Sequence, residues 1–368
     1  MKSVEKKWLL NTFFISLSGA VLFYLLHFPI PWLLGPLVTI LIVKSALKKP
    51  LYWHPTLQYA GLAIIGYMLG SSFTPDNGYQ ILSHLPSMVF ITVFSILFSL
   101  LMGYFVALGS GISVRSAILG SIPGGLSQMV ALSGEIKGVN TSTVATMQII
   151  RILFVIFIVP FLVIHGMAGE KEYYDLVIKS SGSLEGIPFK VPWYSYPITF
   201  FGLWVGIRTA IFLKFPTPYL TGPMMAAIML TLSGIPISPL PTIILIMGQL
   251  FFSTYLAVQM DLSELRNNWS KLLLYVIISC LLLILFCFGI AVLLTKWKGL
   301  EMVSAFLSTA PGGLDVMGIT AKEVGANLPL ITAYQMFRMF FIILVVPPVL
   351  KLIMNRKKAK KPASLGKS

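Results

Sequence analysis

The chain has 368 residues, of which 57% are hydrophobic and only 11% are charged. Because an ordinary soluble domain carries about 25% charged residues, this composition excludes a soluble globular protein. Apolar segments of roughly 17–25 residues recur along the chain, as a bilayer core of about 30 Å requires of its spanning helices. The sequence therefore predicts an all-α, multi-pass membrane protein whose first partner is the lipid bilayer.

The formal net charge of +15 does not indicate a nucleic-acid partner, because of where the basic residues stand. Seven of the 27 Lys and Arg residues lie between positions 351 and 367, after the last apolar segment. Basic residues beside span ends are typical of the cytoplasmic side, so we predict that both termini are cytoplasmic. The basic tail acts as a cytoplasmic anchor or, alternatively, binds anionic lipid headgroups.

Ten apolar segments are predicted to span the membrane. In the first half they cover residues 8–27, 31–47, 56–72, 86–109 and 144–165. In the second half they cover residues 195–213, 218–233, 239–259, 270–295 and 328–352. Six of the seven Trp residues fall at the edges of these segments, as an interfacial aromatic belt would place them.

Three motifs occur twice, in the same order. "FPIPWLLGPL" (28–37) matches "FPTPYLTGPM" (215–224) at six of ten positions, and "PGGLSQM" (123–129) matches "PGGLDVM" (311–317) at five of seven. "MQIIRILFVIFIVP" (147–160) matches "YQMFRMFFIILVVP" (334–347) at six of fourteen, and the offset between the copies is nearly constant. This duplication divides the chain into a first membrane repeat (8–165), a polar connecting loop (166–194), a second membrane repeat (195–352) and a basic cytoplasmic tail (353–368).

Each repeat has about five spans plus a Pro-Gly-Gly stretch, and this stretch decides the topology. A re-entrant stretch leaves five crossings and inverts the repeats, whereas a broken helix that crosses gives six crossings and parallel repeats. Both arrangements place 19 Lys and Arg residues inside and six outside, so the positive-inside rule does not separate them. We favour inverted repeats because transporters often use them.

The Pro-Gly-Gly stretches break the helical pattern at membrane depth. Backbone that leaves a helix there has unpaired N–H and C=O groups, which are tolerated only where protein or a water-filled cavity pairs them. The half-helix that follows directs its N-terminal amides at that cavity. We interpret the two breaks as the walls of a substrate site, the alternative being a tight turn between a span and a surface helix.

A Gln-x-x-Arg pattern follows each break, at Gln148 and Arg151 and again at Gln335 and Arg338. The i,i+3 spacing places amide and guanidinium on one face of a helix. Arg338 is the eleventh residue of its predicted span, where inserting an arginine costs about 2.5–3.5 kcal/mol. Such a group needs a carboxylate, carbonyls, water or an anionic ligand.

Three acidic residues are candidates to balance these charges or to carry a coupling ion. Glu135 and Glu323 precede the two glutamines by 13 and 12 residues, and either pair with the arginines structurally or belong to a substrate or ion path. Asp315 stands where the first repeat has Ser127. A lone carboxylate beside a broken helix is a candidate Na⁺ or H⁺ site, the alternative being an acid stabilised by the helix dipole.

The remaining motifs point to packing, and enzymatic chemistry finds little support. Gly35-Pro36 and Gly222-Pro223 predict kinks and close helix contacts in the second span of each repeat, although these residues also stand where they would border a cavity. The four histidines are scattered without metal-ligand spacing, and no phosphate-binding loop or nucleophile motif occurs. We therefore expect no enzyme activity, no cofactor and no metal.

The repeated "PGGL", the Gln-x-x-Arg pattern and "FPxPxLxGP" resemble the AbrB-duplication family of bacterial membrane proteins over about residues 10–350. The resemblance implies a location in the bacterial cell membrane. Members carry two labels, transcriptional regulator and ammonia monooxygenase, and the second would need a metal site that the histidines do not provide. The family is often grouped with cation–proton antiporters and bile-acid-symporter-like transporters, whose inverted repeats cross as broken helices. That grouping does not identify a substrate.

We therefore predict a secondary transporter of a small anionic organic solute, coupled to Na⁺ or H⁺, with its site at the two broken helices. The alternatives are an indirect role in regulating gene expression and an ammonia monooxygenase-like enzyme; a homodimer is left open. The predicted ion-coupling residues are Asp315, Glu135 and Glu323. The predicted substrate-binding residues are Pro123, Gly124, Gly125, Ser127, Gln128, Gln148, Arg151, Pro311, Gly312, Gly313, Asp315, Gln335 and Arg338.

Overall fold

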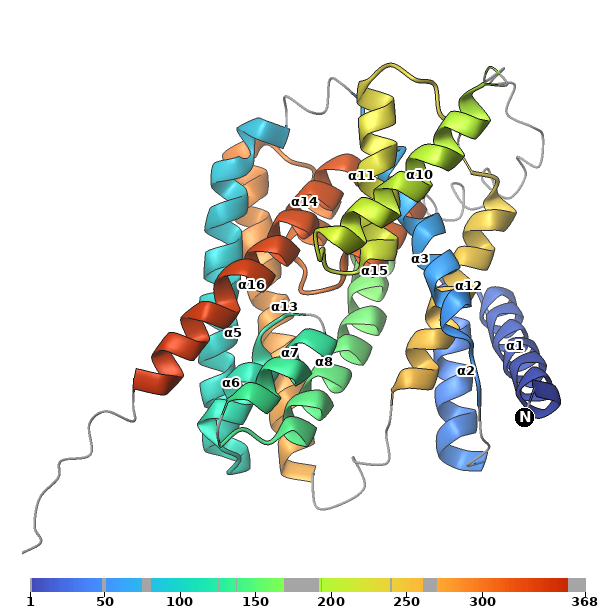
Figure 1. Ribbon diagram of the computed structural model, residues 1–368. Coiled ribbons are helices and arrows are strands. Elements are labelled where there is room, and N and C mark those ends of the chain that lie inside the picture. The colour runs from blue at the N-terminus through green and yellow to red at the C-terminus, as the bar shows by residue number, and fades with distance from the viewer. Residues whose placement is uncertain are drawn as a thin grey trace, which may run out of the picture.

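The computed structural model describes residues 2–47, 51–74, 81–124, 126–136, 138–168, 192, 194–238, 240–260 and 270–356, and every regular element in these ranges is a helix (Figure 1). The first half contains α1 (Lys2–Leu25), α2 (Pro31–Leu47), α3 (Pro55–Gly70), α5 (Leu85–Ser110), α6 (Val114–Ser121), α7 (Leu126–Glu135), α8 (Thr141–Phe161) and its π-helical continuation η1 (Leu162–Ala168). The second half contains α10 (Ser195–Phe212), α11 (Pro218–Leu232), α12 (Thr242–Gln259), α13 (Ser270–Lys298), α14 (Met302–Thr309), α15 (Leu314–Glu323) and α16 (Leu328–Arg356).

Each of the ten apolar segments predicted to span the membrane coincides with one of these helices. Six described helices are long and apolar enough to cross a bilayer, judged by length and composition, and α2 and α11 are shorter apolar helices. The connecting loop (166–194) lies largely outside the described residues, as does the end of the basic tail from residue 357. The all-helical, membrane-type architecture expected from composition is thus what the chain adopts.

Helix boundaries follow local sequence signals. Proline occupies the first turn of several helices, where its missing N–H leaves no bond unmade, as at Pro31 and Pro218. The Asn140 side chain accepts a hydrogen bond from the Thr143 amide (3.1 Å) and closes the start of α8. Gly111 ends α5 in the left-handed region at φ 74°, a conformation that glycine adopts without strain.

The helices pack in two bundles, and neither bundle is one half of the chain. Helices α1, α2 and α3 pack with α10, α11 and α12, whereas α5 to α8 pack with α13 to α16. Each bundle therefore takes corresponding helices from both halves. Contacts of α15 and α16 with α3 connect the two bundles.

In the second bundle, helices α5 and α13 pack against each other and run antiparallel (Figure 1). A short turn connects α5 to α6, and another connects α13 to α14. In the figure, α6 lies near the lower end of this pair and α14 near its upper end. The two interrupted segments therefore enter the bundle from opposite ends.

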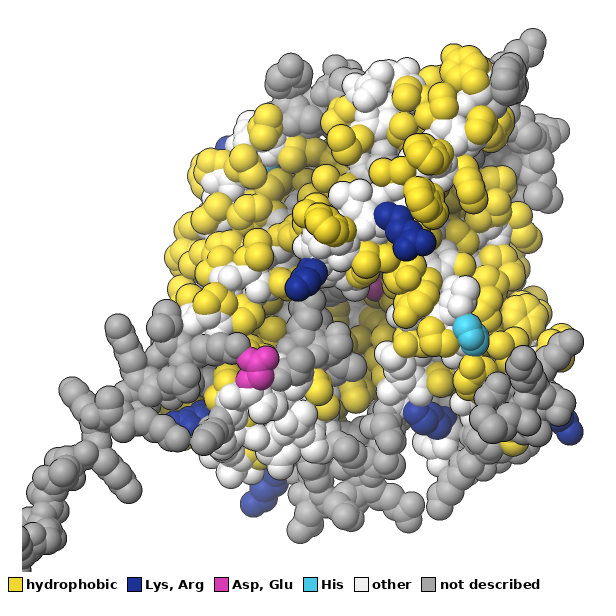
Figure 2. Space-filling view, in the orientation of Figure 1, with side chains coloured by type: hydrophobic (Ala, Val, Ile, Leu, Met, Phe, Trp, Pro, Cys, Tyr) yellow, Lys and Arg dark blue, Asp and Glu magenta, His cyan; other side chains and the backbone are white. Residues whose placement is uncertain are grey.

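The surface of the molecule is unusually apolar. Figure 2 shows hydrophobic side chains over most of the described surface in that view, with few charged groups among them. Phe200 and Phe212 on α10, for example, are 78% and 83% exposed. Large contiguous apolar surface of this kind is not tolerated in water and matches the hydrocarbon of a bilayer.

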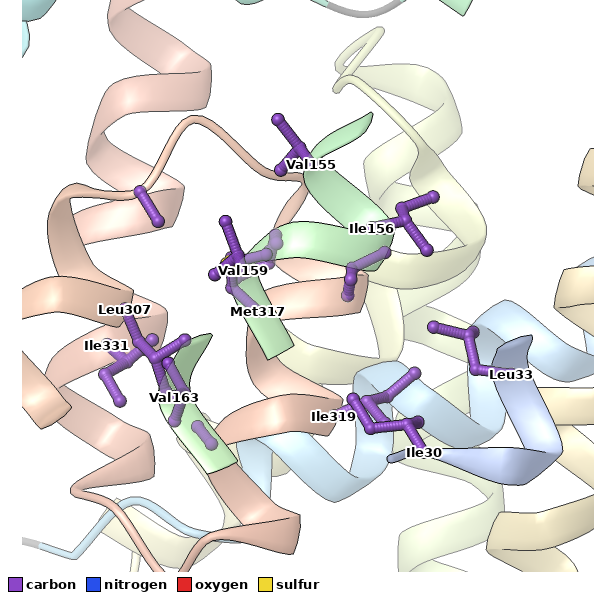
Figure 3. Close-up of a cluster of buried hydrophobic side chains, with 14 of the residues drawn as sticks. Ile30, Leu33, Val155, Ile156, Val159, Val163, Leu307, Met317, Ile319 and Ile331 are labelled. Atoms are coloured by element: carbon purple, nitrogen blue, oxygen red, sulfur yellow. The ribbon is translucent and has the colours of Figure 1, made fainter. Parts of the chain in front are cut away.

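The largest buried cluster packs the second interrupted segment against both bundles (Figure 3). Val159 and Val163, at the end of α8 and in η1, belong to the same cluster as Leu307 of α14 and Met317 of α15. A separate cluster holds the first interrupted segment, where residues of α6 and α7 pack against Ile342 and Val346 of α16. Each half thus supplies the helix that covers the break in the other half.

Candidate functional site

The first helix interruption separates α6 from α7. Helix α6 ends at Ser121, and Ile122 is extended with φ −68° and ψ 128°. Pro123 and Gly124 follow, and α7 starts at Leu126. Gly125 lies outside the described residues, as do the side chains of Ser127 and Gln128.

The second interruption has the same form. Helix α14 ends at Thr309, Ala310 is extended with φ −54° and ψ 139°, and α15 starts at Leu314. The break residues Pro311, Gly312 and Gly313 are all described. In both halves, the last carbonyls of the leading helix are therefore left without helical partners.

Gln148 and Arg151 of α8 pair with the carbonyls of the first break. The Gln148 amide donates to the carbonyls of Leu119 (3.2 Å) and Ile122 (3.0 Å). The Arg151 guanidinium donates to the carbonyl of Ile122 (2.7 Å), and also to those of Ser121 (3.3 Å) and Gly124 (3.4 Å). It also donates to the Gln148 side-chain oxygen, which fixes the two side chains relative to each other.

Gln335 and Arg338 of α16 repeat this arrangement at the second break. The Gln335 amide donates to Leu307 (2.6 Å) and Ala310 (3.2 Å). Arg338 donates to the carbonyls of Ala310 (2.6 Å) and Thr309 (3.3 Å), and further to a carbonyl in the Pro-Gly-Gly stretch and to Gln335. The two arginines are only 5% and 6% exposed.

These contacts give both arginines a clear local role. The end of a helix carries a partial negative charge and unpaired carbonyls, and a guanidinium supplies both positive charge and several donors. Within the described part of the chain, neither Arg151 nor Arg338 hydrogen bonds to a carboxylate. Arg151 and Arg338 also lie close enough to repel each other electrostatically.

The sequence profile of a family described as transition state regulatory protein AbrB matches residues 32–354. The chain belongs to the AbrB family. YhjN of Bacillus subtilis (strain 168), named as an uncharacterized protein, is 25% identical over 96% of each chain. An Escherichia coli (strain K12) protein named as a candidate regulator AbrB is 26% identical over 92% of this chain and 94% of its own.

Among the described residues of this AbrB-family chain, the hydrogen bonds of Arg151 and Arg338 do not go to Glu323, which has another partner. Glu323, at the end of α15, accepts a hydrogen bond from Gln249 of α12 instead. Glu135, at the end of α7, is exposed. The carboxylates therefore stand at the far ends of the half-helices, whereas the arginines stand at the breaks.

Asp315 lies in the first turn of α15. Its Oδ1 atom accepts a hydrogen bond from the Val316 amide (2.9 Å), and the side chain is half-buried. A carboxylate in this position satisfies orphan amides and is stabilised by the partial positive charge of the helix start. This contact matches the interpretation of Asp315 as an acid stabilised by the start of its helix.

Several supporting residues were not singled out from the sequence. The Asn140 backbone amide donates to the Ser116 hydroxyl (2.8 Å), which links the start of α8 to α6. The Asn327 amide donates to the Ser304 hydroxyl (3.0 Å) and links the start of α16 to α14 in the same way. The two asparagines correspond in the two copies, and so do the two serines, so aligning the copies would have found them. The methyl end of Met129 packs over Gly124, and Met317 does the same over Gly312.

The Gly-Pro motifs of the second helices serve close packing. A Cβ atom on Gly222 would lie 2.7 Å from the Gly206 carbonyl oxygen, so α10 and α11 touch through their backbones. Gly19 and Gly35 make the corresponding contact between α1 and α2. The contacting glycine of each first helix was missed, because a single glycine in an apolar segment carries no specific signal.

A cluster of polar side chains lies at the start of α5. The Tyr334 hydroxyl lies 2.7 Å from Ser87 Oγ and 3.2 Å from His84 Nδ1. Partial burial, with repulsion from Lys298, lowers the pKa of His84 below its usual value, which keeps the imidazole neutral near pH 7. Within the described ranges, no group of three or more His, Cys, Asp or Glu side chains is placed to hold a metal ion.

Proposed function

We propose that this AbrB-family protein is a secondary transporter of a small anionic organic solute, coupled to Na⁺ or H⁺. The observation that carries the proposal is the pair of helix breaks inside an apolar helical bundle, with a buried arginine hydrogen-bonded to the carbonyls of each break. Interrupted helices at corresponding positions of two halves are the pattern of a transporter binding site. Two neighbouring guanidinium groups without a carboxylate partner in the described residues favour an anion over a cation.

The two halves are, in this proposal, inverted repeats. Positions that correspond in the two copies contact each other, as a two-fold axis requires: the backbones of Gly61 and Gly248 touch, and Arg151 lies near Arg338. Because α5 and α13 run antiparallel, such an axis lies across the helices and not along them. An axis in the membrane plane inverts one repeat relative to the other.

Alternating access follows from an asymmetry between the two breaks. Helices α15 and α16 pack against α3 of the other bundle, whereas α7 and α8 make at most weak contact with the corresponding helix α12. Among the described helices, the stronger contacts between the bundles are thus on the α15 side. In the opposite state, α7 and α8 would pack against α12, and α15 and α16 would separate from α3. The site would then be open to the other membrane face.

Reconstitution into liposomes tests this proposal. The purified protein is first screened by thermal unfolding against small mono- and dicarboxylates, because a ligand of the folded state raises the melting temperature. A stabilising anion is then used in uptake assays under imposed Na⁺ or pH gradients. We expect gradient-driven accumulation, with the substrate and the ion moving together.

The variant Asp315→Asn separates binding from coupling. Asparagine keeps an oxygen that accepts from the Val316 amide but carries no negative charge, so we expect a normal fold, retained solute-induced stabilisation and loss of gradient-driven accumulation. Asp175→Asn, the same change in the connecting loop, serves as the control. Normal accumulation by Asp315→Asn would overturn the coupling role, and the absence of both stabilisation and flux with every anion would overturn the transporter.

A sensory role is the second candidate, and the regulator name of the Escherichia coli relative favours it. In that case a solute would bind at the same breaks and change the contacts of the protein with a partner, without crossing the membrane. The same assays separate the two functions. Solute-induced stabilisation without uptake under any gradient would favour the sensor.

A further inference from the structure

A small cavity lies beside the first helix break, between α5, α6, α8 and α13. Its volume is about 20 Å³, and the polar side chains around it are Ser99, Ser121, Arg151, Ser279 and Cys280. A cavity of this size holds one particle of about the radius of a water molecule. An organic solute is too large for it, so the cavity is distinct from a solute site.

Two hydroxyl groups at this cavity have no hydrogen-bond partner among the described residues. Ser99 is fully buried, and its Oγ atom is unpartnered. The Oγ atom of Ser121, the last residue of α6, is also buried and unpartnered. Buried hydroxyls normally find a partner, so two of them around one cavity indicate an occupant that accepts or donates hydrogen bonds.

The electrostatic surroundings favour a negative occupant. Arg151 borders the cavity, and its hydrogen bonds go to carbonyls and to Gln148, which partly offset its charge without neutralising it. A second guanidinium, Arg338, lies close enough to act on Arg151 electrostatically, and no carboxylate is among the described residues that line the cavity. A buried positive charge without an ionic partner is stabilised by an anion.

Larger side chains stand at the matching positions of the second half. When the two copies are aligned on their Pro-Gly-Gly stretches, Ser99 corresponds to Cys287 and Ser121 to Thr309. The Thr309 hydroxyl donates to the Cys287 carbonyl (3.0 Å) and therefore has a partner. The second half thus has sulfur where the first has oxygen, and one additional methyl group at the end of the helix before the break.

We propose that this cavity binds one monatomic anion of the halide class, held by the hydroxyls of Ser99 and Ser121 beside Arg151. Both hydroxyls donate to the ion, and the guanidinium supplies the opposite charge. The ion then contributes to holding α5, α6 and α8 together at the break. This site does not depend on the transport of any solute.

Thermal unfolding of the purified full-length protein in neutral detergent tests the proposal. Sodium chloride and sodium bromide are compared with sodium gluconate at equal ionic strength, because gluconate is too large for the cavity. We expect a melting temperature that rises with halide concentration and saturates. In Ser99→Ala/Ser121→Ala, halide binding weakens about tenfold or more, since both hydrogen bonds to the charge are lost.

The control is Ser95→Ala, which makes the same change one turn away on α5. Ser95 also has an unpartnered buried hydroxyl but does not border the cavity, so this variant keeps the halide effect. In gluconate, the double alanine variant is at least as stable as the unsubstituted protein, because unsatisfied hydroxyls have been removed. If the serines had only a structural role, the double alanine variant would not lose the halide effect and yet be at least as stable as the unsubstituted protein in gluconate.

Ser99→Cys/Ser121→Thr provides a second variant that introduces the residues of the other half. It fills the cavity and should lose the halide effect without losing the fold. Anomalous scattering from bromide-grown crystals locates the ion directly. An unchanged melting temperature between chloride and gluconate, or a water molecule in place of bromide, would overturn the proposal and leave the transport assays unaffected.

Discussion

Arg151 and Arg338 each lie beside the end of a helix that stops inside the bundle. A buried carboxylate would be the usual partner of a buried arginine, but here the partners are backbone carbonyls. The carbonyls are already present at the helix end and need positive charge, so the arrangement satisfies both groups without a second buried ion. The glutamine one turn earlier on the helix fixes the rotamer of each arginine.

Replacing Arg338 tests this role. In Arg338→Ala, the carbonyls of Thr309 and Gly312 lose the arginine as donor inside the bundle, and the Ala310 carbonyl keeps only the bond from Gln335. We expect the free energy of unfolding to fall by about 3 kcal/mol or more, as unsatisfied buried groups cost about 1–3 kcal/mol each. Thermal unfolding in detergent measures the loss.

The matched control is Arg208→Ala on α10. Arg208 is exposed and lies over the Trp204 ring at 5.5 Å, a contact that contributes less than about 1 kcal/mol at an exposed site. We expect only a small change in the melting temperature of this variant. Equal losses in Arg338→Ala and Arg208→Ala would contradict the role assigned to the carbonyl contacts.

At the level of elements, the first bundle is organised by backbone contacts between helices. Gly19 meets Gly35, Gly206 meets Gly222, and the backbones of α3 and α12 touch at Gly61. Lipid offers as good an apolar environment as leucine does, so helices in a membrane associate through close packing and not through burial of apolar surface. Small residues at these crossings are therefore the main determinant of how the bundle assembles.

Substituting one crossing glycine should separate the effect of close contact from that of helix propensity. In Gly222→Ala, the new Cβ atom would lie 2.7 Å from the Gly206 carbonyl oxygen, and we expect a loss of about 1–3 kcal/mol from overpacking. Gly289→Ala on α13 meets no atom within 4 Å and should be neutral or stabilising. Similar melting temperatures for the two variants would show that the crossing tolerates a wider separation.

At the level of the whole molecule, the two breaks differ in what covers them. Gly318 of α15 packs directly against the Leu69 side chain of α3, which joins the two bundles on that side. The first break is covered by α16, within its own bundle. The proposed alternating access requires such a difference between two equivalent faces in one end state.

A reversible crosslink on the closed side should stop transport. The Leu69 Cγ atom lies 3.4 Å from a Cβ atom built on Gly318, so the sulfur in Leu69→Cys/Gly318→Cys is placed to form a disulfide between α3 and α15. We expect oxidation to abolish uptake and reduction to restore it, because the bundles cannot separate while they are crosslinked. Leu69→Cys alone is the control, and uptake that continues after complete crosslinking would contradict the exchange of contacts.

The helices and the positions of the breaks were predictable from the sequence alone, because both depend on local composition. Long apolar runs require helices in lipid, and the Pro-Gly-Gly runs end a helix in both halves, whereas Gly35-Pro36 and Gly222-Pro223 lie inside continuous helices. The repetition of "PGGL" and of Gln-x-x-Arg also indicated which side chains belong together in each half. The class of protein and the place of the candidate site follow from this information.

The partners of these side chains were decided by the tertiary structure. No local pattern states that Arg338 faces the carbonyl of Ala310 and not Glu323, because that choice depends on how α16 packs against α14. Three further features depend on tertiary packing in the same way. They are the assembly of each bundle from helices of both halves, the contact of α15 with α3, and the cavity beside Ser99. They depend on shape and volume across contacts that are distant in the chain, and small side chains such as glycine and serine leave little trace of such contacts in sequence patterns.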